Sequence, residues 1–262
     1  MGFEFKKKFG QNFLTDTNLL EKIVCEAGVT KNDTVVEIGA GKGALTAVLS
    51  KYAGKVVSFE IDSELFDFLT EKFSGTNVQM VFDDAMNYDE KKIKELAGER
   101  FKLVANLPYY VTSPILTKFL KMKGIVSATV MVQEEVADRI VAEPKTKAYG
   151  VLTVMCQSFG KASKVMRVNR KMFTPEPNVD SAVVHIEKLE SSDENLEEFF
   201  SFVKGAFAMR RKKLSANLQK LGYDKSEVED VLEKKGYSSL ARAEELSIFE
   251  LKNLFEQIKE KK

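Results

Sequence analysis

The chain has few of the residues that build metal sites, disulfide frameworks or catalytic triads. Its 262 residues include two cysteines, Cys25 and Cys156, and one histidine, His185. Two cysteines so far apart in the sequence do not indicate a disulfide framework or a metal site, and a lone histidine within an expected strand favours a structural role. The sequence therefore argues against a metal centre and against histidine-based triad chemistry.

Long apolar runs are also absent. No run approaches the roughly 18 residues that suggest a membrane-spanning helix. The basic start, residues 1–11, lacks the apolar core of a secretory signal. The composition, 44% hydrophobic and 30% charged, is that of a soluble globular protein. We expect a cytoplasmic protein with room for one large domain and a small one.

The net charge is only +1, but the charges are segregated. Basic residues are concentrated in segments without a single acid, namely residues 6–8, 161–171 and 204–220. Most basic runs are simply solvated faces. Several acid-free runs in a nearly neutral chain favour a partner that carries phosphates.

A strand, a glycine-rich turn and a helix are expected near the start of the chain. Residues 34–38 form an apolar run, and Gly39-Ala40-Gly41-Lys42-Gly43 then leads into a helical pattern. This order brings backbone close to a ligand at a helix N-terminus. Glu60 follows the next expected strand, residues 55–59, where a carboxylate can bind ribose hydroxyls. The pattern fits a nicotinamide dinucleotide and S-adenosylmethionine equally well, and a tight turn without ligand stays open.

Strands and helices alternate through the first two thirds of the chain, which predicts a parallel sheet with helices on both faces. After the third strand, Asp83-Asp84 offers carboxylates that can accept a hydrogen bond from an adenine amine, although they also fit an ordinary loop. Beyond Ser191-Ser192-Asp193 the pattern is helical, so we expect a domain boundary there. The strands are expected at residues 34–38, 55–59, 78–82, 101–105, 127–132, 164–168 and 182–186.

The tetrapeptide Asn106-Leu107-Pro108-Tyr109 directly follows the strand at residues 101–105. It suits attack by an aromatic exocyclic amine, which is a poor nucleophile because its lone pair is delocalised. The Asn106 carboxamide oxygen and a backbone carbonyl, that of Leu107, can accept the two N–H groups and aim the lone pair at an electrophile. Tyr109 offers a flat face for a base. An ordinary strand-ending turn is the alternative.

A loop with two prolines, residues 173–180, lies between the last two expected strands. The prolines stiffen the loop and can hold the ring of Phe173 in place. Phe173 is expected to stack on a base opposite Tyr109. The alternative is a loop aromatic packed on the core.

Taken together, these motifs resemble the ribosomal-RNA adenine N6,N6-dimethyltransferases. The resemblance covers nearly the whole chain, and the proline-bearing loop and C-terminal basic segment are similar to the small-subunit branch of that family. The residues that carry it are Phe9-Gly10-Gln11-Asn12-Phe13-Leu14, Glu37-Ile38-Gly39-Ala40-Gly41, Glu60, Asp84-Ala85, Asn106-Leu107-Pro108-Tyr109, Lys147-Ala148-Tyr149-Gly150, Phe173-Thr174-Pro175-Glu176-Pro177 with the residues that follow to Val184, Arg210-Arg211-Lys212-Lys213-Leu214 and Arg242-Ala243-Glu244-Glu245-Leu246-Ser247.

The resemblance implies a Rossmann-like class I methyltransferase: a mostly parallel seven-stranded sheet in residues 1–190, then a small all-α, RNA-binding domain in residues 191–262. The implied methyl donor is S-adenosylmethionine, and the implied substrate is two adjacent adenines near the 3′ end of small-subunit ribosomal RNA, each methylated twice within the assembling subunit. We expect a monomer. The resemblance assigns the donor site to Asn12, Leu14, Gly39, Glu60, Asp84 and Asn106, the target site to Asn106, Leu107, Tyr109 and Phe173, and RNA binding to Lys147, Arg210, Arg211, Lys212 and Lys213.

The chain departs from many bacterial members at Tyr110, Glu134 and Val151, where asparagine, lysine and arginine are common. These departures concern local RNA contacts. Other functions stay open: a large-subunit enzyme of the macrolide-resistance type, a DNA adenine methyltransferase, and a non-catalytic RNA-binding factor. The DNA enzyme is disfavoured because no separate DNA-reading domain is evident, and the carboxylates of the donor site argue against the non-catalytic factor.

Overall fold

The structure is a computed structural model that describes residues 13–14, 16–189 and 196–259. The chain divides into two compact units. The first contains residues up to 137 together with 160–188, and the second contains residues 138–159 together with those from 189 onward. No helix among the described residues is both long and apolar enough to cross a bilayer.

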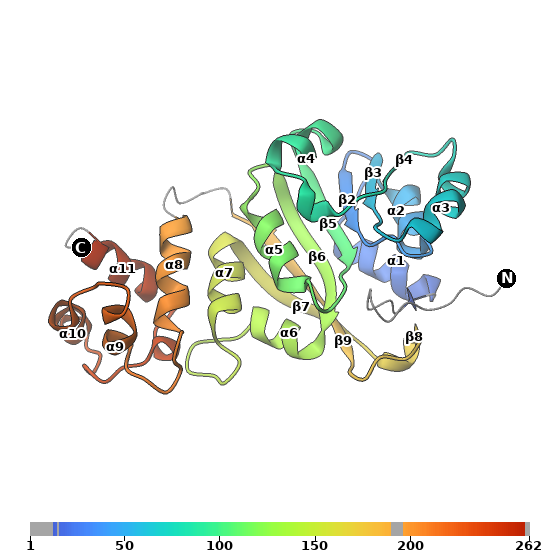
Figure 1. Ribbon diagram of the computed structural model, residues 1–262. Helices are drawn as coiled ribbons and strands as arrows, with labels where there is room; N and C mark the ends of the chain where they lie inside the picture. Colours follow the sequence, from blue (N-terminus) through green and yellow to red (C-terminus); the bar gives the residue numbers. More distant parts are fainter. Residues whose placement is uncertain (1–12, 15, 190–195, 260–262) are drawn as a thin grey trace. The chain divides into compact units, whose positions relative to one another are not determined.

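The first unit is built on a sheet of seven strands in the order β4-β3-β2-β5-β6-β9-β7 (Figure 1). The strands from β4 to β6 are parallel, whereas β9 runs antiparallel to both of its neighbours. Each of the seven strands overlaps one of the expected ones. Their bounds are β2 Thr34–Ile38, β3 Lys55–Phe59, β4 Val78–Val81, β5 Phe101–Asn106, β6 Ile125–Gln133, β7 Gly160–Val168 and β9 Ser181–Lys188.

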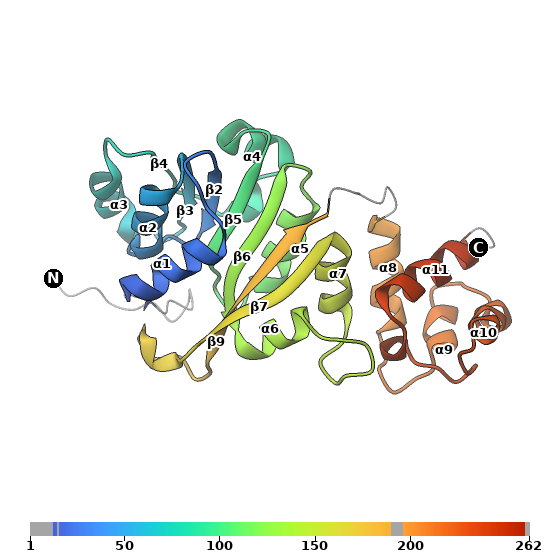
Figure 2. The same cartoon turned by 180° about the vertical axis from the view of Figure 1, so that it is seen from behind.

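Helices cover both faces of this sheet. Leu20, Ile23 and Val24 of α1 pack with α2 on one face, in a core that includes Val35 and Val104. Helices α4 and α5 lie on the other face (Figures 1 and 2). The helices of this unit are α1 Thr17–Glu26, α2 Ala44–Tyr52, α3 Phe66–Phe73, α4 Glu90–Ala97 and α5 Thr112–Lys121, and α6 Glu134–Ile140 begins in it.

Aspartates fix the start of several elements. Asp16 accepts a hydrogen bond from the N–H of Leu19 at 3.0 Å, and Asp89 accepts one from Lys92 at 2.9 Å. Such caps satisfy N–H groups that a helix start leaves without partners.

A small second sheet pairs β1, Phe13–Leu14, with β8, Phe173–Thr174. The segment Phe13–Leu14 is therefore tied to the start of the proline-bearing loop.

The second unit is helical. Its centre is a cluster of aromatic rings in which Phe199, Phe202 and Phe255 lie within 6.2 Å of one another, centroid to centroid. Phe199 and Phe202 lie three residues apart on α8 and give that helix an apolar face, and Phe255 comes from α11. The helices are α7 Val151–Phe159, α8 Leu196–Ala206, α9 Leu214–Gln219, α10 Lys225–Lys234 and α11 Ile248–Lys259. Among the described residues of both units, 3₁₀ turns lie at Ser63–Leu65, Ala85–Asn87, Arg170–Met172 and Ala243–Glu245.

The division of the chain differs from the expected boundary in one respect. Residues 138–159, which the sequence assigned to the first domain, contact the C-terminal helices through α7 and belong to the second unit. A linear reading of composition does not detect such an exchange, because the polar loop at residues 143–150 interrupts the pattern without marking a change of unit.

Candidate active site

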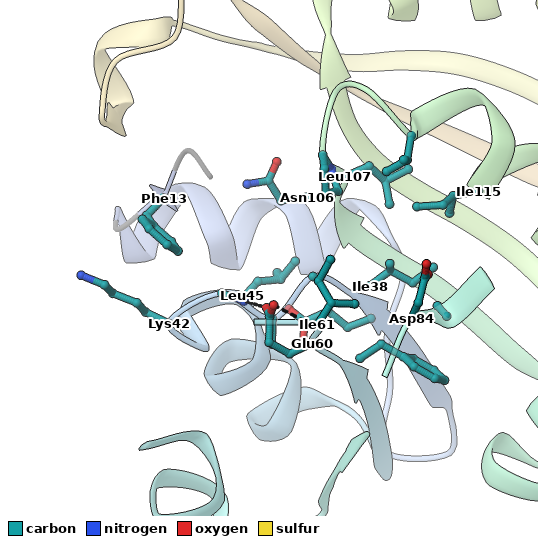
Figure 3. Close-up of a pocket in the computed structure, with 18 of the residues that line it drawn as sticks. Phe13, Ile38, Lys42, Leu45, Glu60, Ile61, Asp84, Asn106, Leu107 and Ile115 are labelled. Atoms are coloured by element: carbon teal, nitrogen blue, oxygen red, sulfur yellow. Dashed lines mark hydrogen bonds between the residues drawn. The ribbon is translucent and has the colours of Figure 1, made fainter. Parts of the chain in front are cut away.

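A pocket opens at the carboxyl ends of the central strands of the first unit. The sheet order places β2 between β3 and β5, so the loops that follow these three strands meet at one edge. Ligands of open α/β sheets bind at this position. Figure 3 shows Glu60, Asp84 and Asn106 around the same cavity, although they come from three different strand ends. Of the expected donor-site residues, the pocket is lined by Leu14, Gly39, Glu60, Asp84 and Asn106.

The glycine-rich turn requires glycine for reasons that the geometry makes explicit. Gly41 has a φ of +55°, and a Cβ there would lie 2.9 Å from the ring of Phe13. Gly43 has a φ of +71°, and its Cβ would lie 2.7 Å from Phe73. Side chains disfavour this backbone region and would also clash. The turn therefore presents bare backbone to the pocket.

Glu60 is 5% exposed and ties the turn to the end of β3. Its carboxylate accepts the N–H groups of Gly41 at 2.7 Å and of Ile61 and Asp62 at 2.8 Å each (Figure 3). Burial raises the pKa of this carboxyl above its ordinary value, although the three backbone hydrogen bonds act in the opposite direction. A carboxylate offers about four acceptor positions. Glu60 therefore keeps acceptor capacity for a ribose hydroxyl.

Glu37 lies behind the turn and is 1% exposed. The hydroxyls of Thr46 and Ser58 both donate to its Oε2 atom at 2.6 Å. Burial raises the pKa of Glu37 to about 7, against the effect of these two hydrogen bonds. In the sequence Glu37 stands only within the glycine motif, but an acid inside an apolar strand is a visible signal of a buried polar contact.

The buried carboxyl of Glu37 predicts a specific pH dependence of stability. Because its pKa in the fold is raised from 4.5 to about 7, its contribution to stability is complete at low pH and is lost as the pH rises through about 7. Glu37→Gln is neutral at every pH and lacks this contribution. Denaturant unfolding between about pH 5 and about pH 8 should show the wild-type free energy of unfolding falling relative to that of the variant. Parallel pH profiles would contradict this account of Glu37.

Asp84 lies at the other end of the pocket. It is exposed, and its Oδ1 atom accepts the N–H of Met86 at 2.8 Å, which starts a 3₁₀ turn. Two apolar side chains that were not predicted to bind the donor, Ile61 and Ile115, also line the cavity. In the sequence, Ile115 stands at helical spacing with Leu116 and Phe119, a pattern that indicates only a buried face. A carboxylate beside apolar surface suits a flat base with a polar edge.

The tetrapeptide leaves the sheet where β5 ends. Asn106 is the last residue of β5 and pairs with Met131 of β6, and the N–H of Leu107 then donates to the Met131 carbonyl at 3.2 Å. Pro108 follows, and its carbonyl accepts the hydroxyl of Thr112 at 3.1 Å. Asn106, Leu107, Pro108 and Tyr109 all line the pocket. The tetrapeptide therefore lies at the end of β5 and on the pocket.

Tyr109 is half-buried, and its hydroxyl lies 2.8 Å from the Oγ atom of Ser181. Phe173 differs from expectation. Its ring is 3% exposed and packs in the core with Leu14 and Leu20, so it offers no open face to a base in this structure. The pairing of β8 with β1 turns the ring inward. Asn12 lies outside the described residues.

The second unit contains a basic basin. Its lining residues are Lys145, Thr146, Lys147, Arg210, Arg211, Arg242 and Glu244. Lys145 and Arg242 were not predicted to bind RNA; they lie in the loop at residues 143–150 and just before Ala243-Glu244, outside the acid-free basic segments. Lys212 and Lys213 follow in the chain but do not line the basin. The segment was expected to be helical, but residues 207–213 form a turn between α8 and α9.

Arg210 connects three parts of the second unit. Its guanidinium donates to Glu244 at 2.9 and 3.0 Å, to the Lys147 carbonyl at 2.8 Å and to the Tyr149 carbonyl at 3.2 Å. These contacts occupy most of its donors. Arg210 therefore supports the basin, whereas the exposed Lys145, Lys147, Arg211 and Arg242 supply its positive surface.

The sheet order, the glycine turn and the strand-end carboxylates define a class I methyltransferase. Solved structures agree: the chain matches a dimethyladenosine transferase from Plasmodium falciparum with a TM-score of 0.81 and 28% identity, over 95% of this chain and 98% of that one. It matches the 23S rRNA methyltransferase ErmE with a TM-score of 0.72 and 30% identity, over 95% of this chain and 100% of that one. Enzymes of this class use S-adenosylmethionine as methyl donor.

The family is equally clear. The model of the ribosomal RNA adenine dimethylase family matches residues 2–260. Proteins named ribosomal RNA small subunit methyltransferase A are 45% identical in Caldanaerobacter subterraneus, over 95% of each chain, and 44% identical in Leuconostoc citreum, over 98% of this chain and 91% of that one. The chain belongs to the ribosomal RNA adenine dimethylase family.

Proposed function

We propose that this chain transfers methyl groups from S-adenosylmethionine to the N6 amines of two adjacent adenines near the 3′ end of small-subunit ribosomal RNA. The observation that carries the proposal is the presence of Asn106 and Leu107 on the same pocket as Glu60 and Asp84. An amine-binding strand end and a nucleoside-binding carboxylate pair thus share one cavity. We further propose that the chain acts as a monomer on the assembling small subunit in the cytoplasm.

The residues of the pocket fit the donor. Glu60 has acceptor capacity for ribose hydroxyls, and Asp84 with Ile61 and Ile115 suits the adenine. The bare backbone of Gly39 and Gly41 and the apolar side chain of Leu14 leave room for the methionine part. When bound there, the sulfonium supplies an electrophilic methyl group.

Asn106 and Leu107 act on the target amine. The Oδ1 atom of Asn106 and the carbonyl of Leu107 accept its two N–H groups, which favours a tetrahedral nitrogen with a directed lone pair. Tyr109 stacks on the base, which must leave its helix or loop to enter the pocket. The nitrogen becomes strongly acidic once it is alkylated, so its proton passes to solvent and no dedicated base is needed. After the first methyl transfer, the N6 amine keeps one N–H group, which one of the two oxygens of Asn106 and Leu107 can still accept.

The basin of the second unit supports RNA binding through phosphates. Arg211→Ala should reduce the slope of log affinity against log salt by about one unit, because one phosphate contact is lost. Arg210→Ala should lower the free energy of unfolding, since Glu244 and two loop carbonyls lose their donor. RNA binding over a series of salt concentrations and denaturant unfolding measure the two effects.

Lys234→Ala is the matched control, because Lys234 is an exposed cation of the same unit outside the basin. If an Arg210→Ala, Arg211→Ala double variant keeps the wild-type slope of log RNA affinity against log salt, the basin does not bind RNA phosphates and is only a solvated surface.

A second candidate is a large-subunit enzyme, favoured by the structural similarity to ErmE. The proteins named small subunit methyltransferases are more similar in sequence, at 44–45% against 30% identity. The deciding experiment supplies labelled donor to undermethylated small subunits and, separately, large subunits, and maps the products. Dimethylated adenines in the small-subunit RNA are expected. Methylation of large-subunit RNA alone supports the second candidate, and donor binding without methylation supports a non-catalytic factor.

A further inference from the structure

The side chain of Tyr109 is held at both ends. Its backbone belongs to the turn after β5, and its hydroxyl lies 2.8 Å from the Oγ atom of Ser181, a residue 72 positions further along the chain. Ser181 is fully buried and does not line the pocket. It therefore reaches the target side of the pocket only through Tyr109.

Ser181 is itself rigidly placed. As the first residue of β9 it pairs with Gln133 of β6 on one side and with Val168 of β7 on the other. The preceding residue, Asp180, accepts hydrogen bonds from the N–H of Arg170 and from the Arg167 guanidinium, each at 2.9 Å. Ser181 therefore lies on a strand that is paired on both sides, next to the hydrogen-bonded Asp180. The position of its hydroxyl is fixed, and so is the contact that it offers to Tyr109.

The turn that carries Tyr109 needs such a fixed point. Residues 107–111 belong to no helix or strand, so the backbone alone does not determine the direction of the ring. Phe173, the expected second aromatic, is buried in the core. The orientation of the Tyr109 ring, which lines the pocket, then depends on the hydroxyl contact, since stacking requires a ring of defined tilt.

We propose that Ser181 is a positioning residue that fixes the ring of Tyr109 in the orientation in which the target adenine stacks. The inference rests on the proposed function, because it concerns the base that this function brings to the pocket. It assigns to the start of β9 a role in target binding and none in donor binding.

The test is a double-mutant cycle measured as kcat/KM for the RNA substrate. Tyr109→Phe keeps the ring and removes the hydroxyl, and Ser181→Ala removes its partner. Each should lower kcat/KM by about three- to tenfold, the usual scale of one net hydrogen bond. The double variant should be no worse than either single variant, because the same bond is lost in all three. Calorimetry should give the wild-type donor affinity throughout.

Thr129→Val is the matched control. The Thr129 hydroxyl lies 2.7 Å from Nδ1 of His185, so this variant also removes a partly buried contact between β6 and β9. Thr129 does not line the pocket. It should lose stability and keep kcat/KM. Additive effects in the cycle, or a Ser181→Ala that loses only stability as this control does, would overturn the proposal.

Two further outcomes are separable. If Ser181→Ala does not fold, Tyr109→Phe still tests the bond from the half-buried partner, and wild-type kcat/KM in that variant would overturn the proposal. If the wild-type protein binds donor but methylates no adenine, the proposed function fails, and with it the role assigned to Tyr109.

Discussion

Asn106→Ala is expected to lower kcat by roughly 10²–10³-fold, the cost of removing one preorganised polar group from a transition state. The side chain lies on the pocket at the end of β5, where its oxygen can accept an N–H of the target amine. Without that acceptor the amine keeps its planar, weakly nucleophilic form. Single-turnover methylation of small subunits measures the loss, and calorimetry should show that most donor affinity survives.

Asn106→Asp is the informative control for this prediction. Aspartate keeps an oxygen acceptor at the same position, so it should retain more activity than alanine. Equal activity of the alanine variant and the wild-type protein would remove Asn106 from the mechanism. Loss of donor binding in step with activity would instead assign the residue to the donor site alone.

Glu60→Ala is expected to weaken donor binding by roughly 10- to 100-fold, the range for a hydrogen bond to a charged group. Two effects add. The ribose hydroxyls lose their acceptor, and the N–H groups of Gly41, Ile61 and Asp62 lose the carboxylate that holds the glycine turn to β3. Isothermal calorimetry with the donor measures the change. The RNA affinity should remain near the wild-type value.

Asp67→Ala is the control, because Asp67 is an exposed acid of α3 that does not line the pocket. It removes the same charge and should leave donor binding unchanged. An unchanged donor affinity in Glu60→Ala would refute the ribose contact. Equal losses in both variants would mean that charge, not the placement of the carboxylate, sets the affinity.

The strands and the glycine turn could be predicted from the sequence because their signals are local. Buried parallel strands are largely continuous apolar runs, as in β2 and β5. β2 ends directly before Gly39, and β5 ends with Asn106. The spacing from Gly39 to Glu60 follows from one strand–helix–strand repeat. The pocket could therefore be assembled in outline from residues that each mark the end of a strand.

The parts that sequence reasoning missed depend on contacts between distant residues. Phe173 faces the core because β8 pairs with β1, and a stiff loop alone does not reveal which way its aromatic points. Arg210 is occupied by Glu244, 34 residues away, and by loop carbonyls more than 60 residues away. The contact between Tyr109 and Ser181 spans 72 positions. The sequence shows that these residues are basic or aromatic, but it does not show which distant residue each side chain contacts.

The most direct test of the methyl-transfer geometry is a crystal structure with an unreactive donor analogue and an RNA that carries the target adenine. The N6 atom should lie about 3 Å from the Oδ1 atom of Asn106 and from the Leu107 carbonyl oxygen, with the base against Tyr109. An adenine bound away from the end of β5, with the Asn106 carboxamide directed elsewhere, would contradict the mechanism.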